Sequence, residues 1–375
     1  MSTAAALRIL DPGRFATIQD DGRFHARQWG VPRAGMLDPW LYRLALAALF
    51  HASGRPLAAL TPPPPLGPPL TFPLIEHHFG GFAFTAEGAP FPVVVAGNVR
   101  LRIEDTQLTV HGVLSWVLAP GETVIVERIG EGRIAVVGAG TLAIPECLGS
   151  TSTELRARFG DWQGRPLAAG DRIPVTPPTQ PPRAAFLPLP WPLASTEPIR
   201  SLPGAQWSAF ADDARAAWVS ALWQVTPASD RMGARLEGPM LVATPPEIRS
   251  EPLWPGAVQV PPAGQPIVLL NDAQTMGGYP KIAQVIEADR WRLAHLQPGE
   301  EIRFAWLTDP DNAWHAFSAR WRRFQQHALA RARSAASATP DLAALIGAGG
   351  EPDPQRLWHE NLVSGVWDAT WEDFV

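Results

Sequence analysis

Residues 258–287 read VQVPPAGQPIVLLNDAQTMGGYPKIAQVIE and decide how the rest of the chain is interpreted. An apolar run at residues 266–270 predicts a buried β-strand, because short apolar runs between turn signals are typical of strands. A polar patch, a Gly-Gly-Tyr-Pro turn and Lys281 follow it. Lys281 is the only lysine among 31 basic residues. Because a lysine changes its pKa readily on burial and an arginine does not, we predict a specific role for Lys281, the alternative being that any cation serves there.

Amide and hydroxyl side chains surround this predicted strand. Amides hold a lactam, ureido or carboxamide group through paired donors and acceptors, and paired glycines let the backbone approach a ligand closely. A tyrosine hydroxyl donates to a developing oxyanion. The alternative is that these groups satisfy only the loop backbone. We therefore predict substrate binding by Gln265, Asn271, Gln274, Thr275, Gly277 and Gly278, and catalysis by Asp272, Tyr279 and Lys281.

The composition excludes several classes of protein. The chain has 375 residues, which suits two domains or one large one, and 46% of them are hydrophobic. A net charge of −5 and a pI near 6.0 argue against a nucleic-acid surface. Because no run of eighteen apolar residues or signal peptide is apparent, we expect no membrane association. The single cysteine, Cys147, indicates no disulfide framework and a cytoplasmic location.

Short runs rich in Val, Ile and Leu recur between Gly and Pro turn signals. This pattern is typical of a mainly-β sandwich or barrel. We predict strands at residues 91–96, 108–117, 123–129, 133–138, 267–270 and 301–306. Turns are predicted at residues 97–98, 120–121, 130–132 and 298–299.

Helices are expected to be few and peripheral. Asp38 is a suitable N-cap and Pro39 a suitable first helical residue, which predicts a helix over residues 38–50. Two further helices are expected at residues 209–220 and 314–337.

A proline-rich stretch divides the chain. We interpret residues 1–175 as an N-terminal β module and residues 176–193 as a linker, because proline lacks the amide donor that regular structure needs. Residues 194–310 then form a C-terminal β module. Residues 311–375 form a helical tail that contains tryptophans.

A second polar constellation lies in residues 19–23, which read QDDGR. The Asp-Asp-Gly sequence suits a tight turn, because Asx side chains bond their own backbone and glycine accepts positive φ. The alternative places Asp20 and Arg23 on the rim of a pocket, as an acid that moves protons and a cation that binds substrate. Arg33 lies shortly before the first predicted helix and is a further candidate for substrate binding.

Three other patterns have a structural interpretation beside a functional one. Residues 149–153 (GSTST) and Glu154 resemble a capping box at a helix start, which we favour over a carboxylate pocket. Arg231 either grips a carboxylate or phosphate bidentately or forms an Arg–Asp pair on the surface. His77 and His78 are predicted to lie at an edge or in a loop, and no metal site is expected. The sequence has no Walker, Rossmann or HExxH signature.

Four motifs in one order resemble the biotin-dependent carboxyltransferase-like family. They are GRFATIQDDGRFHARQWGVPRAGMLDPW (13–40), CLGSTSTELRARFGDWQGRPLAAGDRI (147–173), SDRMGARLEGP (229–239) and the opening segment extended to residue 304. This family includes the C-type subunit of the prokaryotic 5-oxoprolinase, the antagonist of a sporulation-kinase inhibitor, and part of the carboxyltransferase region of urea carboxylase. The resemblance implies a fold of two cyclophilin-like β-barrel modules.

The resemblance also implies a function. The implied function is that of a component similar to the C-type subunit of 5-oxoprolinase. This component would act within an ATP-dependent complex that opens 5-oxoproline to glutamate. Such a component would belong to an amidohydrolase and be inactive alone. The expected cofactor is ATP, bound by the complex, and no biotin is expected on this chain, because it lacks a Met-Lys pair. The expected partners are a B-type (kinase-inhibitor-like) subunit and an A-type subunit, and the substrate is a small amide or lactam.

Two other functions stay open. One is a carboxyltransferase component that acts on urea or a similar amide with a biotin-carrying partner. The other is a non-catalytic regulatory protein that binds a kinase-inhibitor-like partner. Two departures from the family pattern bear on this choice. Ala59 stands where the family usually has an acid, and Met276 replaces a threonine, which indicates a different substrate or reduced activity.

Overall fold

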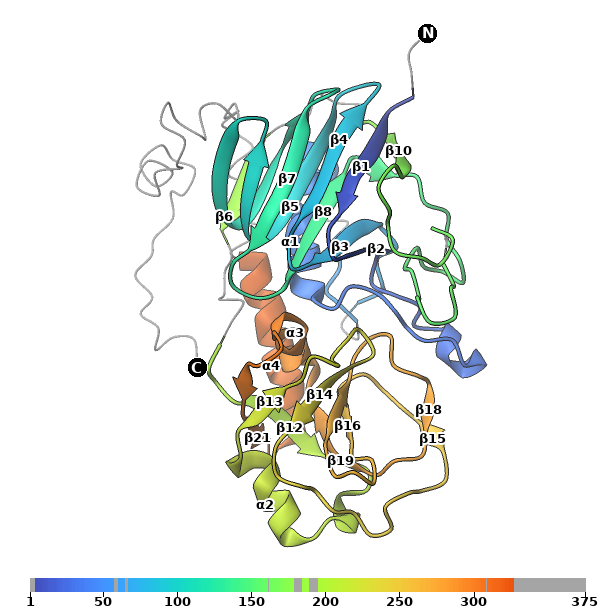
Figure 1. The fold of residues 1–375 in the computed structure, drawn as a ribbon, viewed down its shortest axis with the longest axis vertical. Helices are drawn as coiled ribbons and strands as arrows, with labels where there is room; N and C mark the ends of the chain where they lie inside the picture. Colours follow the sequence, from blue (N-terminus) through green and yellow to red (C-terminus); the bar gives the residue numbers. More distant parts are fainter. Residues whose placement is uncertain are drawn as a thin grey trace.

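The computed structural model describes residues 4–56, 60–64, 67–160, 162–178, 184–188, 195–307 and 309–326. Two curled β-sheets occupy the two halves of the molecule (Figure 1). Four α-helices accompany them in the described part of the chain. The predicted mainly-β fold with few helices is therefore confirmed.

The first sheet contains eleven strands. Its main path runs β2-β3-β8-β5-β7-β4-β1-β10-β9, and β6 pairs with β5 and with β11. The strands are β1 (Ala6–Pro12), β2 (Phe15–Gln19), β3 (Leu74–His78), β4 (Phe82–Glu87), β5 (Phe91–Ile103), β6 (Thr106–Leu118), β7 (Thr123–Ile129), β8 (Ile134–Ala139), β9 (Thr141–Leu142), β10 (Arg172–Thr176) and β11 (Ala185–Pro188). Alternate side chains of these strands form one apolar core, because successive strand residues point to opposite faces.

The turn predicted at residues 97–98 is wrong. β5 continues through Gly97, which pairs with Gly112 of β6. The chain reverses later, at residues 104–105, where Glu104 has a φ of 50°. Gly97 has a φ of 141°, which residues with a Cβ rarely adopt, so this glycine marks a local distortion inside a strand and not its end.

The second sheet contains eight strands in the order β20-β13-β14-β17-β16-β19-β12-β21. They are β12 (Ile199–Pro203), β13 (Trp223–Val225), β14 (Gly233–Glu237), β16 (Ala257–Gln259), β17 (Ile267–Leu269), β19 (Lys281–Val285), β20 (Glu301–Ile302) and β21 (Phe304–Trp306). A separate two-stranded ribbon joins β15 (Glu251–Pro252) to β18 (Met276–Gly277). The opening segment of the sequence thus supplies three neighbouring strands of this sheet and half of the ribbon.

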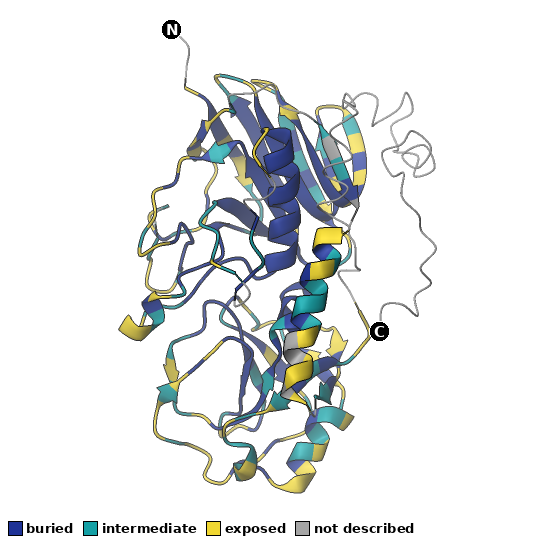
Figure 2. Ribbon diagram, turned by 180° about the vertical axis from the view of Figure 1, so that it is seen from behind, coloured by how far each residue is buried: buried dark blue, intermediate teal, exposed yellow. Residues whose placement is uncertain are grey.

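Helix α1 (Pro39–Ala52) confirms the helix predicted at residues 38–50. The Asp38 carboxylate accepts hydrogen bonds from the Trp40 and Leu41 amides, as an N-cap should. Every residue of α1 is buried, and Figure 2 shows this helix in dark blue across the first sheet. Apolar side chains of β5, β6 and β8 cover one side of α1, and Phe317 of α4 (Pro310–Phe324) lies in the same apolar cluster.

The other helices differ from their predicted bounds. α2 (Asp212–Ser220) starts three residues later than predicted, because a 3₁₀ turn, η3 (Trp207–Ala209), precedes it. α3 (Glu287–His295) was not predicted. α4 starts earlier than predicted, at Pro310 after the N-cap Asp309. Residues 327–337 of that prediction, like Trp358, Trp367 and Trp371 of the tail, lie outside the described residues.

The predicted linker is only partly described, and the domain boundary stays a prediction. Residues 179–183 and 189–194 lie outside the described part of the chain. Between them, β11 pairs with β6 of the first sheet. None of the helices in the described ranges combines the length and the apolar character that a membrane crossing requires.

Candidate functional site

A buried salt bridge joins the two sheets. We call it the interface cluster, and it consists of Glu76 from β3, Arg231 from the loop before β14 and Asp272 from the loop after β17. Arg231 donates Nε to Asp272 Oδ2 at 2.9 Å and Nη2 to Oδ1 at 3.0 Å, while its Nη1 donates to Glu76. All three side chains are buried. The alternative prediction of a surface pair for Arg231 is therefore wrong.

The two carboxyl groups of this cluster have opposite pKa shifts. Burial raises the pKa of Asp272 to about 6, and the attraction of Arg231 offsets only part of this effect. Burial acts in the same direction on Glu76. Arg231, His78 and the Leu37 amide outweigh it and hold the pKa of Glu76 at about 2. Asp272 is thus easier to protonate than an ordinary aspartate, while Glu76 stays ionised.

Glu76 makes stability depend on acid pH. Its folded pKa of about 2 lies below the ordinary value of 4.5, so its contribution is present above pH 4.5 and is lost as the pH falls towards 2. Asp272 has the opposite sign, because its raised pKa favours the folded state below pH 3.8 and this gain is lost as the pH rises through about 6. We expect wild-type unfolding free energy, from urea titrations, to fall more steeply between pH 4.5 and 2 than that of Glu76→Gln. Parallel curves would contradict this assignment.

The loop before α1 is bonded to the second sheet beside this cluster. Asn271 donates Nδ2 to the Met36 carbonyl at 2.7 Å, and its carbonyl accepts from the Ala34 amide at 3.0 Å. Arg231 donates Nη2 to the Gly35 carbonyl at 2.7 Å. The N-terminal motif and the opening segment, far apart in sequence, therefore meet at one place.

Asp20 accepts hydrogen bonds from the loop that the sequence predicted as a capping box. Its Oδ1 accepts from the hydroxyls of Ser150 at 2.6 Å and Ser152 at 2.5 Å, and its Oδ2 from the Thr151 amide at 2.7 Å. The capping-box prediction is wrong, because no helix occurs at residues 149–160. These hydroxyls bind a carboxylate of the same chain, which fixes the loop against β2.

Arg23 is a buried guanidinium whose partners are neutral. Its Nε donates to the Cys147 carbonyl at 3.0 Å, its Nη2 donates to the Ser152 carbonyl, and its guanidinium carbon lies 4.9 Å from the centre of the Phe159 ring. Nη1 has no hydrogen-bond partner among the described residues. Burial is the main cause of the lowered pKa of Arg23, and Asp20 opposes it. An acceptor from outside the chain would satisfy Nη1.

Arg33 is buried, and its positive charge has no ion-pair partner among the described residues. Its Nε donates to the Asp21 carbonyl at 3.3 Å, and its guanidinium carbon lies 3.9 Å from the centre of the Phe24 ring. Burial, followed by repulsion from Arg290, lowers its pKa to about 9. Arg33 therefore belongs to a region of surplus positive charge.

A second group, the lysine cluster, consists of Gln206, Glu251 and Lys281. Lys281 Nζ pairs with Glu251, and Gln206 donates Nε2 to the same carboxylate at 3.0 Å. The Lys281 amide donates to Gln206 Oε1 at 3.2 Å. The lysine is buried, whereas Glu251 is about one third exposed. Lys281 is thus held by an acid that reaches solvent.

Amide side chains lie beside the lysine cluster. Gln259 pairs with Lys281 across β16 and β19, and Gln274 donates Nε2 to Gln259 Oε1 at 3.4 Å. Gly277 pairs with Glu251 across the ribbon. A Cβ at Gly277 would lie 2.7 Å from Gln259 Nε2 and 2.6 Å from Leu253 Cδ1, so a larger residue would force these side chains to shift.

The remaining predicted residues are not in either cluster. The side-chain amide of Gln265 is hydrogen-bonded to the backbone of Gly238. Its Oε1 accepts from the Gly238 N–H at 2.9 Å, and its Nε2 donates to the Gly238 carbonyl at 3.1 Å. Thr275 and Gly278 are half-buried near the ribbon. The Tyr279 side chain is exposed.

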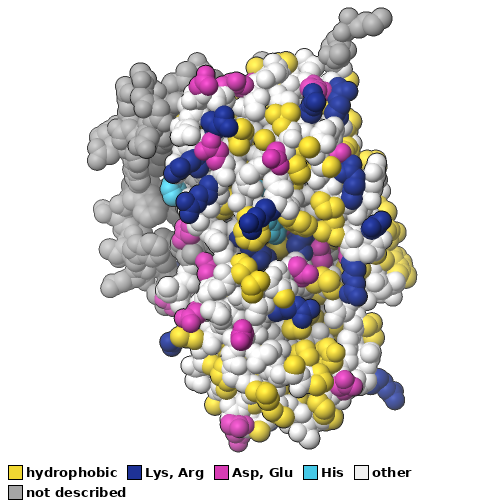
Figure 3. All heavy atoms as spheres, viewed as in Figure 1, with side chains coloured by type: hydrophobic (Ala, Val, Ile, Leu, Met, Phe, Trp, Pro, Cys, Tyr) yellow, Lys and Arg dark blue, Asp and Glu magenta, His cyan; other side chains and the backbone are white. Residues whose placement is uncertain are grey.

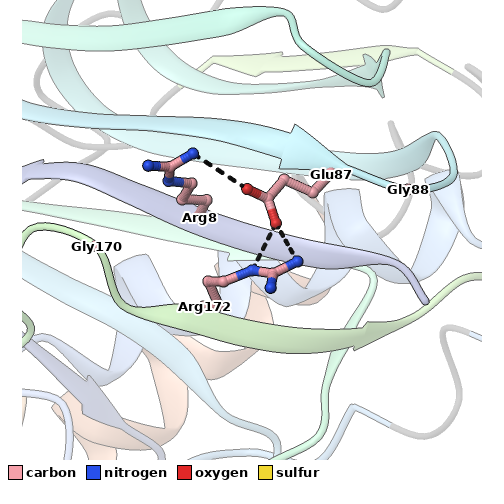
Figure 4. Close-up of a pocket in the computed structure, with 5 residues that line it drawn as sticks. All are labelled: Arg8, Glu87, Gly88, Gly170 and Arg172. Atoms are coloured by element: carbon pink, nitrogen blue, oxygen red, sulfur yellow. Dashed lines mark hydrogen bonds and ion pairs between the residues drawn. The ribbon is translucent and has the colours of Figure 1, made fainter. Parts of the chain in front are cut away.

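Charged side chains gather over the middle of the face in Figure 3, where the two halves meet. A separate shallow pocket lies on the first sheet, between β1, β4 and β10 (Figure 4). There Glu87 accepts from Arg172 Nε at 2.6 Å and from Arg8 Nη1 at 3.4 Å. This pocket contains none of the predicted site residues, and its arginines have a carboxylate partner.

The sequence model of the carboxyltransferase domain, subdomain A and B, matches residues 66–306, well over half of the chain. The chain belongs to this carboxyltransferase domain family. The matched range of the carboxyltransferase domain includes both clusters, but it begins after Asp20, Arg23 and Arg33.

Two relatives of this carboxyltransferase-family chain are similar over most of their length. The C-type subunit of 5-oxoprolinase from Escherichia coli (strain K12) is 35% identical over 303 residues, which cover 80% of this chain and 90% of the relative. The C-type subunit of 5-oxoprolinase from Haemophilus influenzae is 35% identical over 301 residues, covering 79% and 89%.

Solved structures share the fold. TTHA0988 matches with a TM-score of 0.66 and 32% identity over 81% of this chain and 56% of that one, so this chain spans little more than half its length. The urea amidolyase of K. lactis matches with a TM-score of 0.72 and 23% identity, over 87% of this chain and 20% of that one. This likeness confirms the two-barrel fold class of the carboxyltransferase family.

Two acids of these clusters, Glu76 and Glu251, were not predicted from the sequence. His77 and His78 were predicted at an edge or in a loop, but β3 lies inside the sheet between β2 and β8, and both histidines are buried. His78 Nε2 lies 2.9 Å from Glu76 Oε1. An acid within an apolar strand was the available signal, because such an acid needs a cation. Glu251, between prolines and polar residues, offers no such signal.

Proposed function

We propose that this chain is the C-type subunit of an ATP-dependent 5-oxoprolinase complex that opens 5-oxoproline to glutamate. The observation that carries the proposal is the 35% identity to two proteins named as C-type subunits of 5-oxoprolinase, of which the chain covers about nine tenths. In this proposal the chain works with a B-type and an A-type partner. ATP is bound by the complex.

The proposed chemistry begins with a stable lactam. Transfer of the γ-phosphoryl group of ATP to the lactam oxygen, with release of ADP, would make the ring carbon electrophilic enough for attack by water. The ring C–N bond would then break and inorganic phosphate would leave. Asp272 is suited to move the proton, because a carboxyl with a pKa of about 6 changes its charge close to neutral pH. Lys281, positioned by Glu251, would stabilise the negative charge that develops.

The substrate carboxylate is assigned to Arg23. Arg231, the sequence-based candidate, already donates to two carboxylates and a carbonyl. Arg23 instead keeps one buried Nη1 without a partner in the described chain, so a carboxylate there would add a charge-assisted hydrogen bond. The Asn271 and Gln265 side chains are hydrogen-bonded to the backbone. This leaves Gln274, which donates to Gln259 opposite Lys281, to orient the ring.

Asp272→Asn tests the proposed proton transfer. We expect glutamate formation by the complex, assembled with its partners and supplied with ATP and 5-oxoproline, to fall by about 10²–10⁴-fold. The wild-type rate should rise with pH through about 6, because Asp272 must lose its proton to act as a base, and the variant should lack this rise. Asp105→Asn, at the exposed turn between β5 and β6, is the matched control.

Three outcomes would reject parts of the proposal. Near-normal turnover of Asp272→Asn removes the proposed base. Capture of a biotinylated partner from the native lysate, with activity on urea, would favour the carboxyltransferase function. Capture of a B-type partner without glutamate formation by the wild-type assembly would favour the regulatory function.

A further inference from the structure

Two arginines, one from each half of the molecule, contact one loop, and a third arginine lies near one of them. Arg27 of η1 (Ala26–Trp29) donates Nη2 to the Leu253 carbonyl. Arg290 of α3 donates Nη1 to the Pro255 carbonyl at 3.5 Å. Arg33, from the loop before α1, lies near enough to Arg290 to be repelled by it. We call these three side chains the arginine cluster.

The positive charge of this cluster exceeds its negative charge. Arg290 pairs with Glu287 at the start of α3. Arg27 and Arg33 have no ion pair with any carboxylate in the described ranges, and the hydrogen bonds recorded for them go to backbone carbonyls. Repulsion from Arg290 also lowers the pKa of Arg27, second only to burial. Two guanidinium charges are therefore left without a counterion.

This arrangement is costly unless an anion binds. Buried arginines are normally paired, because removal of a charge from water is unfavourable without compensation. Arg33 is 6% exposed and Arg290 is 7% exposed. Arg27 Nη1 is buried and has no hydrogen-bond partner in the part of the chain that the structure describes. The cluster thus contains both surplus charge and an unused donor.

The rim of the cluster is open to solvent. The Trp254 ring lies 5.1 Å from the guanidinium carbon of Arg27 and is 61% exposed. Trp29, at the end of η1, is 66% exposed. The side of the cluster formed by Arg27, which is half-buried, therefore borders solvent.

We propose that Arg27, Arg33 and Arg290 form a binding site for a phosphate group. A phosphate monoester carries a charge of about −1.5 to −2 at pH 7, which matches the surplus of two, whereas a carboxylate carries one charge. Guanidinium groups bind phosphate oxygens bidentately, which a single lysine cannot do. The site does not depend on which amide or lactam the chain handles. The phosphate can come from a nucleotide or from a smaller phosphorylated molecule.

Titration with inorganic phosphate tests this site. We expect the full-length wild-type chain to bind phosphate in calorimetry and to gain thermal stability from it. Arg33→Gln should weaken the affinity by about tenfold or more, because it removes one charge-assisted partner. Arg172→Gln, in the pocket of Figure 4, is the matched control, because that arginine has a carboxylate partner, and its phosphate affinity should equal the wild type's.

A second variant tests whether misfolding explains a loss of phosphate binding. Arg27→Gln changes a side chain on a short surface turn, and it should weaken phosphate binding as Arg33→Gln does, with its melting temperature in phosphate-free buffer close to the wild type's. Phosphate affinity unchanged in both variants, or no phosphate binding by the wild type, would overturn the proposal. Titrations with tripolyphosphate, ATP and adenosine show whether the phosphate group belongs to a nucleotide or to a smaller molecule. ATP binding tighter than tripolyphosphate supports a nucleotide at the phosphate site, and equal affinities support the phosphate group alone.

Discussion

Replacement of Arg231 by methionine is expected to lower the free energy of unfolding by about 3–5 kcal/mol. The reason is that Glu76 and Asp272 would both stay buried after losing the cation between them. Methionine approximately fills the volume of the arginine stem, so the loss measures mainly the uncompensated charge. Urea unfolding at neutral pH gives the value, with tryptophan fluorescence as the probe.

The control for this prediction lies on the adjoining strand. Arg235 of β14 is exposed, and Arg235→Met should change the free energy of unfolding by no more than about 0.5 kcal/mol. Similar losses in the two variants would mean that the hydrophobic contacts of an arginine stem, and not the buried charge, explain the effect. A milder loss in Arg231→Met at pH 3 than at pH 7 would agree with protonation of the carboxyl groups left behind.

The second large effect is expected at the buried pair of Asp21 and Arg43. Arg43 of α1 donates Nη1 to Asp21 Oδ1 at 2.8 Å and Nη2 to Oδ2 at 2.7 Å, and both side chains are at most 1% exposed. The Leu70 amide donates to the same carboxylate at 2.7 Å. We expect Arg43→Met to lower the free energy of unfolding by about 3–5 kcal/mol, because the carboxylate of Asp21 would lose its cation in the interior.

A double-mutant cycle separates the pair from its surroundings. Asp21→Asn in the Arg43→Met background should recover part of the loss, with a coupling energy of about 0.5–3 kcal/mol. Arg100→Met, at an exposed position of β5, controls for the removal of a charge. Strict additivity of the two single changes would show that Asp21 and Arg43 do not depend on each other.

The sequence predicted the regular elements of this fold well where local signals act alone. Asp38 and Pro39 define the start of α1 because a cap and a fixed φ are properties of neighbouring residues. The strands near residues 91–138 follow from their Val- and Ile-rich composition. Gly97 was wrongly predicted as a turn, because the sheet partner that makes a glycine useful inside β5 lies on another strand.

Only part of the candidate site could be predicted from the sequence. The opening segment contributes Asp272 and Lys281, and the structure places them in two separate ion pairs. Their partners come from distant segments, and a pairing of this kind depends on how the sheets meet. The hydroxyls of residues 150–152 gave a capping signal because a helix N-terminus and a buried carboxylate use the same chemistry. The departure noted at Ala59 lies outside the described residues, and Met276 lies exposed in β18.

Glu76 and Arg231 are 155 positions apart in the chain. A ribosome adds about 5–20 residues per second, so roughly 8–30 s pass between the synthesis of this carboxylate and that of its guanidinium partner. During that interval the first-sheet strands that follow β3 are synthesised, and the acid inside β3 has no cation from the second sheet. The nascent N-terminal half therefore carries this acid with only His78 and the Leu37 amide as partners until translation of the second half supplies the guanidinium of Arg231.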